Sequence, residues 1–172
     1  MVIWITGLSG AGKTTIGRCL HEIWKAKAPN TVLVDGDAVR RLVRFNADDD
    51  AYSVEGRRAV ASRYCDICAW LDSQDINVVC CTISFFEELR ARNRRDLSEY
   101  FEVFISVPLE TLKQRDKKGL YERALKGEIR NVVGVDLPLD PPIAPNMVVD
   151  NKPDRHDFRQ IAEDILGRAL AR

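Results

Sequence analysis

The sequence predicts an α/β fold of three layers, in which about five parallel strands are flanked by helices. Short apolar runs rich in β-branched residues recur along the chain without polar alternation, which is typical of strands buried on both faces. Segments with helical periodicity separate these runs, as in repeated βαβ units. The 172 residues are one domain's length, so we expect residues 1–172 to form a single domain.

The predicted strands are the apolar runs themselves. VIWIT at 2–6 opens the chain, and TVLVD at 31–35 is a second short run that ends in an aspartate. INVVCCT at 76–82 and FEVFISV at 101–107 are longer apolar runs, and NMVVD at 146–150 is the last. Because none of the five alternates strictly between apolar and polar residues, each is expected to lie inside a covered sheet.

Helix-periodic segments connect these strands. The predicted helices span residues 13–27, 37–44, 54–74, 86–98, 109–115 and 154–171. Two other segments have the composition of loops: NADDDAYS at 46–53 is polar and acidic, and 135–146 contains four prolines.

Composition and charge argue against several function classes. The 26 basic and 26 acidic side chains cancel, so nothing indicates broad attraction to nucleic acid or to anionic lipid. No apolar run approaches the roughly 20 residues that cross a bilayer, and the segment MVIWITG lacks the basic start of a signal peptide. We therefore expect a cytoplasmic protein that binds neither nucleic acid nor membrane.

The five cysteines are an odd number and fall within apolar elements. Cys65 and Cys68 form a CxxC pattern, but they lie one turn apart on a predicted helix, and the sequence offers no second ligand pair. The alternatives are a metal or redox site and ordinary packing of small apolar side chains. We expect packing.

The first predicted strand is followed directly by GLSGAGKT, which fits the phosphate-binding loop (P-loop) pattern G-x-x-x-x-G-K-[ST]. Its glycines let the backbone curl so that N–H groups point at a triphosphate, and the next helix adds its positive N-terminal end. In this pattern Lys13 reaches the β- and γ-phosphates and the Thr14 hydroxyl binds Mg²⁺. The predicted ATP-binding residues are Gly7, Ser9, Gly10, Ala11, Gly12, Lys13, Thr14, Thr15 and Arg115.

Two aspartates follow the second predicted strand, in VDGDAVRR. Asp35 and Asp37 therefore lie at the carboxyl edge of the sheet, where open α/β sheets bind ligands. A carboxylate there can coordinate Mg²⁺ or accept a proton from an attacking hydroxyl, whereas Asp37 can also simply cap the next helix. We expect catalysis from at least one of them and metal binding by Asp35, with Arg40 holding an anion on the acceptor. Of Arg57 and Arg58, one is expected to face solvent.

A basic segment at 116–134 carries five basic and three acidic residues and three glycines. The alternatives are a static surface loop and a mobile lid. Phosphoryl transfer needs cations around the γ-phosphoryl and exclusion of water, and a basic segment hinged at glycines can supply both when it closes. We therefore predict a basic lid, with inward-facing charges at Arg115, Lys118 and Arg130.

Together these motifs resemble the adenylylsulfate (APS) kinases. The stretches GLSGAGKTT, DGDAVR, ISFF and VPLETLKQRDKKGLYERALKGEIRNVVGVD follow the order and spacing of that family over about residues 2–150. The resemblance implies a P-loop kinase fold, commonly dimeric, that uses ATP and Mg²⁺ to phosphorylate a ribose 3′-hydroxyl on a nucleotide acceptor. The predicted catalytic residues are Lys13, Asp35, Asp37 and Ser84, the last at the position of a serine sometimes proposed as a phosphorylated intermediate. The predicted acceptor-binding residues are Asp37, Arg40, Arg57, Ser84, Lys118, Leu120, Arg130 and Val132.

The sequence departs from this family around the acceptor pocket. FNADDDAYS stands in place of Leu-Gly-Phe, whose phenylalanine stacks on the acceptor adenine, and Val132 replaces the second stacking phenylalanine of the lid. The Asp-Arg-x-x-Asn motif that grips adenylylsulfate has Ala51, Tyr52 and Glu55 at its positions. Since each stacking face contributes about 1–3 kcal/mol, the loss of both should weaken adenine binding by orders of magnitude.

We therefore expect a kinase of this family that acts on another nucleotide, best a cytidine diphosphate derivative such as the cytidine diphosphoramidate of capsule pathways. One alternative is an APS kinase with a divergent pocket, in which Tyr52, Phe45 or Phe86 replaces a missing aromatic partner. Another is a non-catalytic regulatory protein that binds nucleotide, which the retained Lys13 disfavours. We favour direct in-line transfer between the two substrates over a phosphorylated Ser84.

Overall fold

The structure is a computed structural model, and it describes residues 1–42, 52–116, 119–151 and 157–171. The first six elements are β1 (Val2–Thr6), α1 (Lys13–Lys27), β2 (Thr31–Asp35), α2 (Gly36–Leu42), α3 (Val54–Asp72) and β3 (Asn77–Thr82). The remainder are α4 (Glu87–Asp96), β4 (Tyr100–Ser106), α5 (Leu109–Gln114), α6 (Leu120–Leu125), β5 (Met147–Asp150) and α7 (Phe158–Leu170).

Within the described residues the strands form a five-stranded sheet in the order β2-β3-β1-β4-β5. Every neighbouring pair is parallel, and β1, the middle strand, pairs with both β3 and β4. The predicted α/β fold with about five parallel strands is therefore confirmed, with strand boundaries that differ from the predicted ones by at most one residue.

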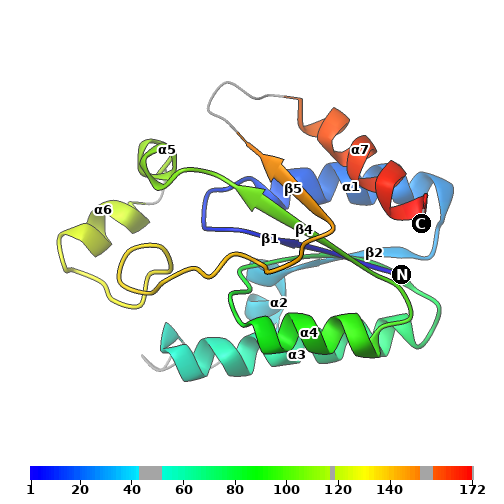
Figure 1. The fold of residues 1–172 in the computed structure, drawn as a ribbon, viewed down its shortest axis with the longest axis horizontal. Helices are drawn as coiled ribbons and strands as arrows, with labels where there is room; N and C mark the ends of the chain where they lie inside the picture. The colour runs from blue at the N-terminus through cyan, green and yellow to red at the C-terminus, as the bar shows by residue number, and fades with distance from the viewer. Residues whose placement is uncertain (43–51, 117–118, 152–156, 172) are drawn as a thin grey trace.

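Helices cover both faces of the sheet, which makes the three layers (Figure 1). On one face α1 and α7 pack together over a core that includes Ile3 and Ile5. On the other face α3 and α4 cover a second core that includes Val2 and Trp4. Alternate residues of β1 thus enter opposite cores, which explains why its sequence is apolar throughout.

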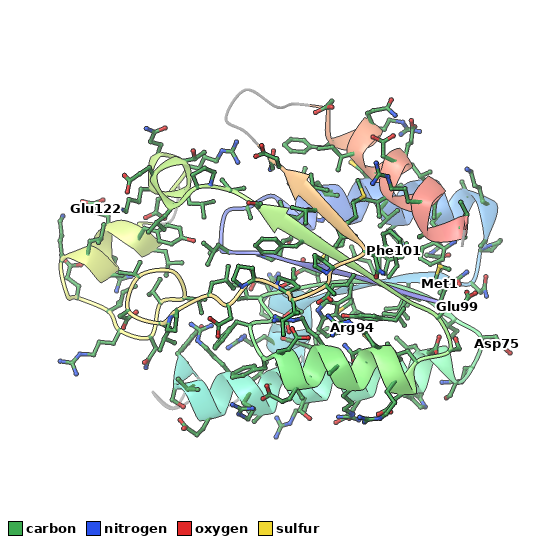
Figure 2. The ribbon with its side chains drawn as sticks, viewed as in Figure 1. Met1, Asp75, Arg94, Glu99, Phe101 and Glu122 are labelled. Carbon is green, nitrogen blue, oxygen red and sulfur yellow. The ribbon has the colours of Figure 1, made fainter. Side chains whose placement is uncertain are left out.

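A helix that the sequence analysis did not foresee, α6, lies within the basic segment 116–134. The Asp116 carboxylate accepts hydrogen bonds from the backbone N–H groups of Leu120, Tyr121 and Glu122 at 2.8, 2.6 and 3.1 Å, so it caps the first turn. Tyr121 is buried in the first core, whereas Glu122 points away from the sheet on the outer side of α6 (Figure 2). The segment is therefore anchored to the core.

The two cysteines of the CxxC pattern are both buried in α3, within the second core. Burial raises the pKa of the Cys65 thiol to about 12, so it stays protonated at neutral pH. The expectation that these side chains serve packing is confirmed. No helix in the described part of the chain is long and apolar enough to cross a membrane.

A buried arginine joins the end of β3 to its surroundings. Arg90 of α4 is fully buried and donates hydrogen bonds to the carbonyl oxygen of Ser84 at 2.7 Å and to Glu87 at 2.9 Å. It also lies 3.5 Å from the buried Glu102 carboxylate of β4, whose other oxygen accepts a bond from Arg94. Figure 2 shows Arg94 between α4 and the sheet. This network fixes the segment that follows β3.

Candidate active site

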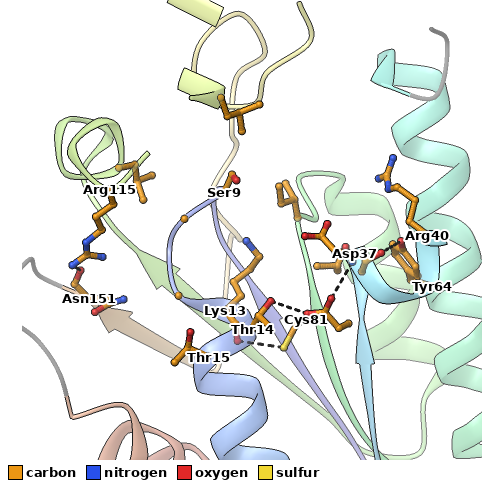
Figure 3. A pocket seen from close by; sticks show the side chains of 18 of the residues that line it. Ser9, Lys13, Thr14, Thr15, Asp37, Arg40, Tyr64, Cys81, Arg115 and Asn151 are labelled. Atoms are coloured by element: carbon orange, nitrogen blue, oxygen red, sulfur yellow. Dashed lines mark hydrogen bonds between the residues drawn. The ribbon is translucent and has the colours of Figure 1, made fainter. Parts of the chain in front are cut away.

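A cavity of about 560 Å³ opens at the carboxyl ends of β1, β2 and β3. In Figure 3, Lys13 stands between two groups of side chains: Arg115 and Asn151 lie on one side, and Asp37 and Arg40 lie on the other. The cavity wall includes twelve of the site residues that were predicted from the sequence: Ser9, Gly10, Gly12, Lys13, Thr14, Thr15, Asp35, Asp37, Arg40, Arg57, Arg115 and Leu120.

The P-loop takes its shape from glycines that no other residue replaces without strain. Gly10 and Gly12 have φ of 76° and 95°, in the left-handed region. A side chain on Gly7 would place its Cβ 2.6 Å from the carbonyl oxygen of Ile105 on the neighbouring strand. The helix α1 then begins at Lys13 without an acidic residue in its first turn, so its N-terminal end keeps its positive field for an anion.

Lys13 lies inside the cavity, and its Nζ donates a hydrogen bond to the carbonyl oxygen of Leu8 at 2.7 Å. Burial lowers its pKa from 10.5 to about 8, although the neighbouring Cys81, Asp37 and Asp35 oppose this shift. A poorly solvated ammonium is an efficient partner for an anion, because little water must be displaced when a phosphate arrives.

Asp35 is held in place by three hydrogen bonds. Its Oδ2 accepts from the Thr14 hydroxyl at 2.7 Å, and its Oδ1 accepts from the backbone N–H groups of Asp37 and Ala38, both at 3.1 Å. A hydroxyl beside a carboxylate, at the mouth of a phosphate loop, is a set of hard oxygen ligands of the kind that Mg²⁺ prefers. The predicted metal-binding pair therefore fits the ion, with Asp35 fixed at the N-terminus of α2.

Asp37 differs from Asp35 in its surroundings, because its carboxylate faces the cavity from an exposed position. Arg40 follows one turn later on α2, and its Nη1 is buried without a hydrogen-bond partner among the described residues. Tyr64 of α3 donates to the carbonyl oxygen of Gly36 at 2.7 Å, which ties α2 to α3 at this wall. The wall thus offers a proton acceptor beside a cation.

The two adjacent arginines of α3 face in different directions, as the sequence analysis expected. Arg57 lines the cavity, and it donates to the carbonyl oxygens of Asn131 at 2.6 Å and Tyr52 at 3.0 Å. Burial, and then the charge of Arg40, lower its pKa. Arg58 faces outward, where it pairs with Glu88 and stacks over the Phe86 ring.

The other predicted site residues are divided between the cavity and its surroundings. Arg115 and Leu120 line the cavity, and Arg115 donates to the carbonyl oxygen of Asn151 at 3.5 Å. The structure does not place Ser84, Arg130 or Val132 in the cavity wall. Ser84 is buried, and its hydroxyl has no hydrogen-bond partner within the described residues, whereas Arg130 is exposed. Val132 is 5% exposed and packs in the first core. Gly7 and Ala11 belong to the loop behind the wall, and Lys118 lies outside the described residues.

The sequence analysis missed several residues of the wall, above all Asn151 and Tyr121. Asn151 is the first residue after β5, and a polar residue at the carboxyl end of a parallel strand is a signal that could have identified it. Tyr121 carried no local signal, since its place depends on how the segment 116–134 folds back on the P-loop. The remaining unpredicted wall residues are Gly36, Val60, Ala61, Tyr64, Cys81, Thr82, Ile83, Leu112, Asp116 and Phe158.

The chain is similar in sequence and in structure to kinases of one family. The family model described as adenylylsulphate kinase matches residues 1–150. The chain is similar to a cytidine diphosphoramidate kinase of Campylobacter jejuni, with 42% identity over 150 residues that cover 87% of this chain and 85% of the relative. It is also similar to an adenylyl-sulfate kinase of Gloeothece citriformis, with 34% identity over 166 residues that cover 96% and 92%. The structure of the Mycobacterium tuberculosis APS kinase in complex with AMPPNP and APS matches with a TM-score of 0.86 and 30% identity, over 99% of this chain and 97% of that chain.

Proposed function

The chain belongs to the adenylylsulfate kinase family of ATP-dependent phosphotransferases, and we propose that it phosphorylates the ribose 3′-hydroxyl of a cytidine diphosphate derivative, best cytidine diphosphoramidate. ATP is the proposed donor, with its phosphates in the P-loop and its base on the side of Arg115. Thr14 and Asp35 would hold Mg²⁺, which would neutralise charge on the β- and γ-phosphates. We also propose that the protein is a homodimer, which light scattering can test.

In this proposal Asp37 is the general base. Both carboxylate oxygens of Asp35 already accept hydrogen bonds, whereas Asp37 faces the cavity from an exposed position. Asp37 would accept the proton of the 3′-hydroxyl as that oxygen attacks the γ-phosphorus in line, while the bond from the γ-phosphorus to the β,γ-bridging oxygen breaks and ADP leaves. Lys13 would stabilise the charge that develops on the transferred group. The hydroxyl of Ser84 is buried outside the cavity wall, which favours direct transfer over a phosphoserine intermediate.

The position of Val132 is the observation that carries the choice of acceptor. This residue stands where the family has an aromatic stacking partner, and here its small side chain is buried in the first core. Phe86, considered above as a substitute, is 5% exposed beneath Arg58. An acceptor with a smaller base needs less aromatic surface, and the relative that is 42% identical is named for a cytidine substrate. These features favour a pyrimidine acceptor.

Tyr52 supports the second candidate, an APS kinase with a rearranged pocket. Tyr52 is 52% exposed, and the guanidinium carbons of Arg40 and Arg57 lie 5.2 and 5.4 Å from the centroid of its ring. An aromatic face beside two cavity arginines could stack on adenine. Phe45, the third substitute considered above, lies outside the described residues.

A side-by-side assay with saturating ATP distinguishes the two candidates. We expect kcat/KM for cytidine diphosphoramidate to exceed that for adenylylsulfate by at least about 10-fold, which requires a difference of only about 1.4 kcal/mol in transition-state binding. The KM for ATP should be the same with either acceptor. A higher kcat/KM for adenylylsulfate that Tyr52→Leu lowers would instead establish the second candidate.

A further inference from the structure

Two carbonyl oxygens of the P-loop accept hydrogen bonds from side chains that are distant in the sequence. The Tyr121 hydroxyl of α6 donates to the carbonyl oxygen of Ser9 at 2.8 Å. The Nδ2 amide of Asn151, directly after β5, donates to the carbonyl oxygen of Ala11, also at 2.8 Å. Each bond therefore joins the loop to a different part of the fold.

The peptide plane links these carbonyls to the phosphate-binding face of the loop. In a trans peptide the C=O of one residue and the N–H of the next point in opposite directions. A bond that holds the Ser9 carbonyl outward consequently turns the N–H of Gly10 toward the other side. The same relation connects the Ala11 carbonyl with the N–H of Gly12.

These peptide units need external support because a glycine follows each of them. Gly10 and Gly12 already lie in the left-handed region, and glycine reorients at little steric cost. Local sterics therefore do little to prevent either peptide from turning its carbonyl, instead of its N–H, toward an incoming phosphate. Such a turn would replace an attractive dipole with a repulsive one.

The two donors are themselves rigid. Tyr121 is 2% exposed, and its helix is capped by the Asp116 carboxylate. Asn151 is 1% exposed, and its backbone N–H continues the sheet by bonding to the carbonyl oxygen of Ser106 at 3.0 Å. A Cβ on Gly12 would approach Nδ2 of Asn151 to 2.8 Å, so the amide is packed directly against the loop.

We propose that Tyr121 and Asn151 are positioning residues that hold the N–H groups of Gly10 and Gly12 toward the donor phosphates. The inference rests on the proposed ATP site at the P-loop. It assigns to α6 a role besides the predicted lid closure, because Tyr121 of this helix holds the phosphate-binding loop. The two residues act through the backbone and need not touch the substrate themselves.

The test uses two variants: Tyr121→Phe keeps the aromatic ring, and Asn151→Leu keeps the branched shape of the side chain. Binding of ADP and of adenosine is measured by calorimetry with Mg²⁺ present. Each variant removes one hydrogen bond, so we expect its Kd for ADP to rise about 5-fold to 10-fold. In the double variant the two effects should multiply, because different peptide units are released. Adenosine has no phosphate, so its Kd should stay within about 2-fold of wild type. Tyr100→Phe is the matched control, since its hydroxyl has no hydrogen-bond partner among the described residues and lies at the opposite end of β4 from the cavity.

An equal loss of ADP and adenosine affinity would overturn the inference, because it would mean that the variants merely disturb packing. Unchanged ADP affinity in both single variants would overturn it as well. Neither result would affect the proposed acceptor, which takes no part in this assay. A wild-type protein that bound adenosine and ADP equally would overturn the proposed phosphate site together with this inference.

Discussion

Replacement of the buried Arg90 by methionine tests the network that supports the wall of the cavity. Arg90 is fully buried and donates to Ser84, Glu87 and the carbonyl oxygen of Asp140. Removing one partner of a buried ion pair costs about 3–5 kcal/mol, because the other charge is left uncompensated. Glu102 would keep its hydrogen bond to Arg94, so we expect the free energy of unfolding to fall by the lower end of this range, about 3 kcal/mol.

The assay is urea unfolding followed by circular dichroism, together with thermal unfolding. At about 2–4 °C per kcal/mol for a chain of this size, the midpoint temperature should fall by about 6–12 °C. Arg95→Met is the matched control on the same helix, since Arg95 is 70% exposed and pairs with the adjacent Asp96. It should change the free energy of unfolding by less than about 0.5 kcal/mol. Equal midpoints for the two variants would refute the estimate.

The loss caused by Arg90→Met should also depend on pH. Burial raises the pKa of Glu102 above its ordinary 4.5, while Arg94 and Arg90 oppose that shift, so the variant should have a still higher pKa there. A group whose pKa is higher in the folded state binds more protons when folded, and its burial therefore costs stability as pH rises. Arg90 also helps to lower the pKa of Glu87, a stabilising contribution that disappears at acid pH. The Glu102 effect predicts that the difference from wild type in the free energy of unfolding narrows between pH 7 and pH 5. The Glu87 effect adds to this narrowing only near and below the ordinary pKa of 4.5. A difference that stays constant from pH 7 to pH 5 would contradict the Glu102 effect.

Lys13→Ala should lower kcat by at least about 100-fold with any acceptor, because it removes a cation from the developing phosphoryl charge; turnover within about 3-fold of wild type would exclude Lys13 from the mechanism. Residues 116–134 should become protected from hydrogen exchange when ADP and Mg²⁺ bind, and identical exchange rates with and without ligand would mean that the segment is a static surface element. Val132→Phe should destabilise the protein by about 1–3 kcal/mol, because the larger side chain overfills the space around a residue that is only 5% exposed. Unchanged stability together with a higher kcat/KM for adenylylsulfate would mean instead that the new ring reaches the acceptor.

The features that the sequence predicted well are those with a local physical cause. A strand covered on both faces is apolar at most positions and does not alternate with polar residues, so VIWIT and NVVCCT identify β1 and β3 directly. A backbone that curls around a phosphate needs glycine at fixed spacing, so the P-loop is visible in eight residues. The expectation that Asp35 lies at the carboxyl edge of the sheet also had a local cause, because it ends a parallel strand, and in the structure it accepts a hydrogen bond from Thr14 there at 2.7 Å.

The features that only the tertiary structure decided depend on contacts between distant segments. From the sequence we expected one of Arg57 and Arg58 to face solvent, without knowing which. Only the packing of α3 shows that Arg57 reaches the cavity and the carbonyl oxygen of Asn131, which lies 74 residues further along the chain. The donors to the P-loop carbonyls are 112 and 140 residues away from their acceptors. No local propensity or spacing encodes such a bond. It exists because the sheet places β5 beside β4 and because α6 folds back over the loop, so the residues that orient the phosphate site become visible only once the chain is folded.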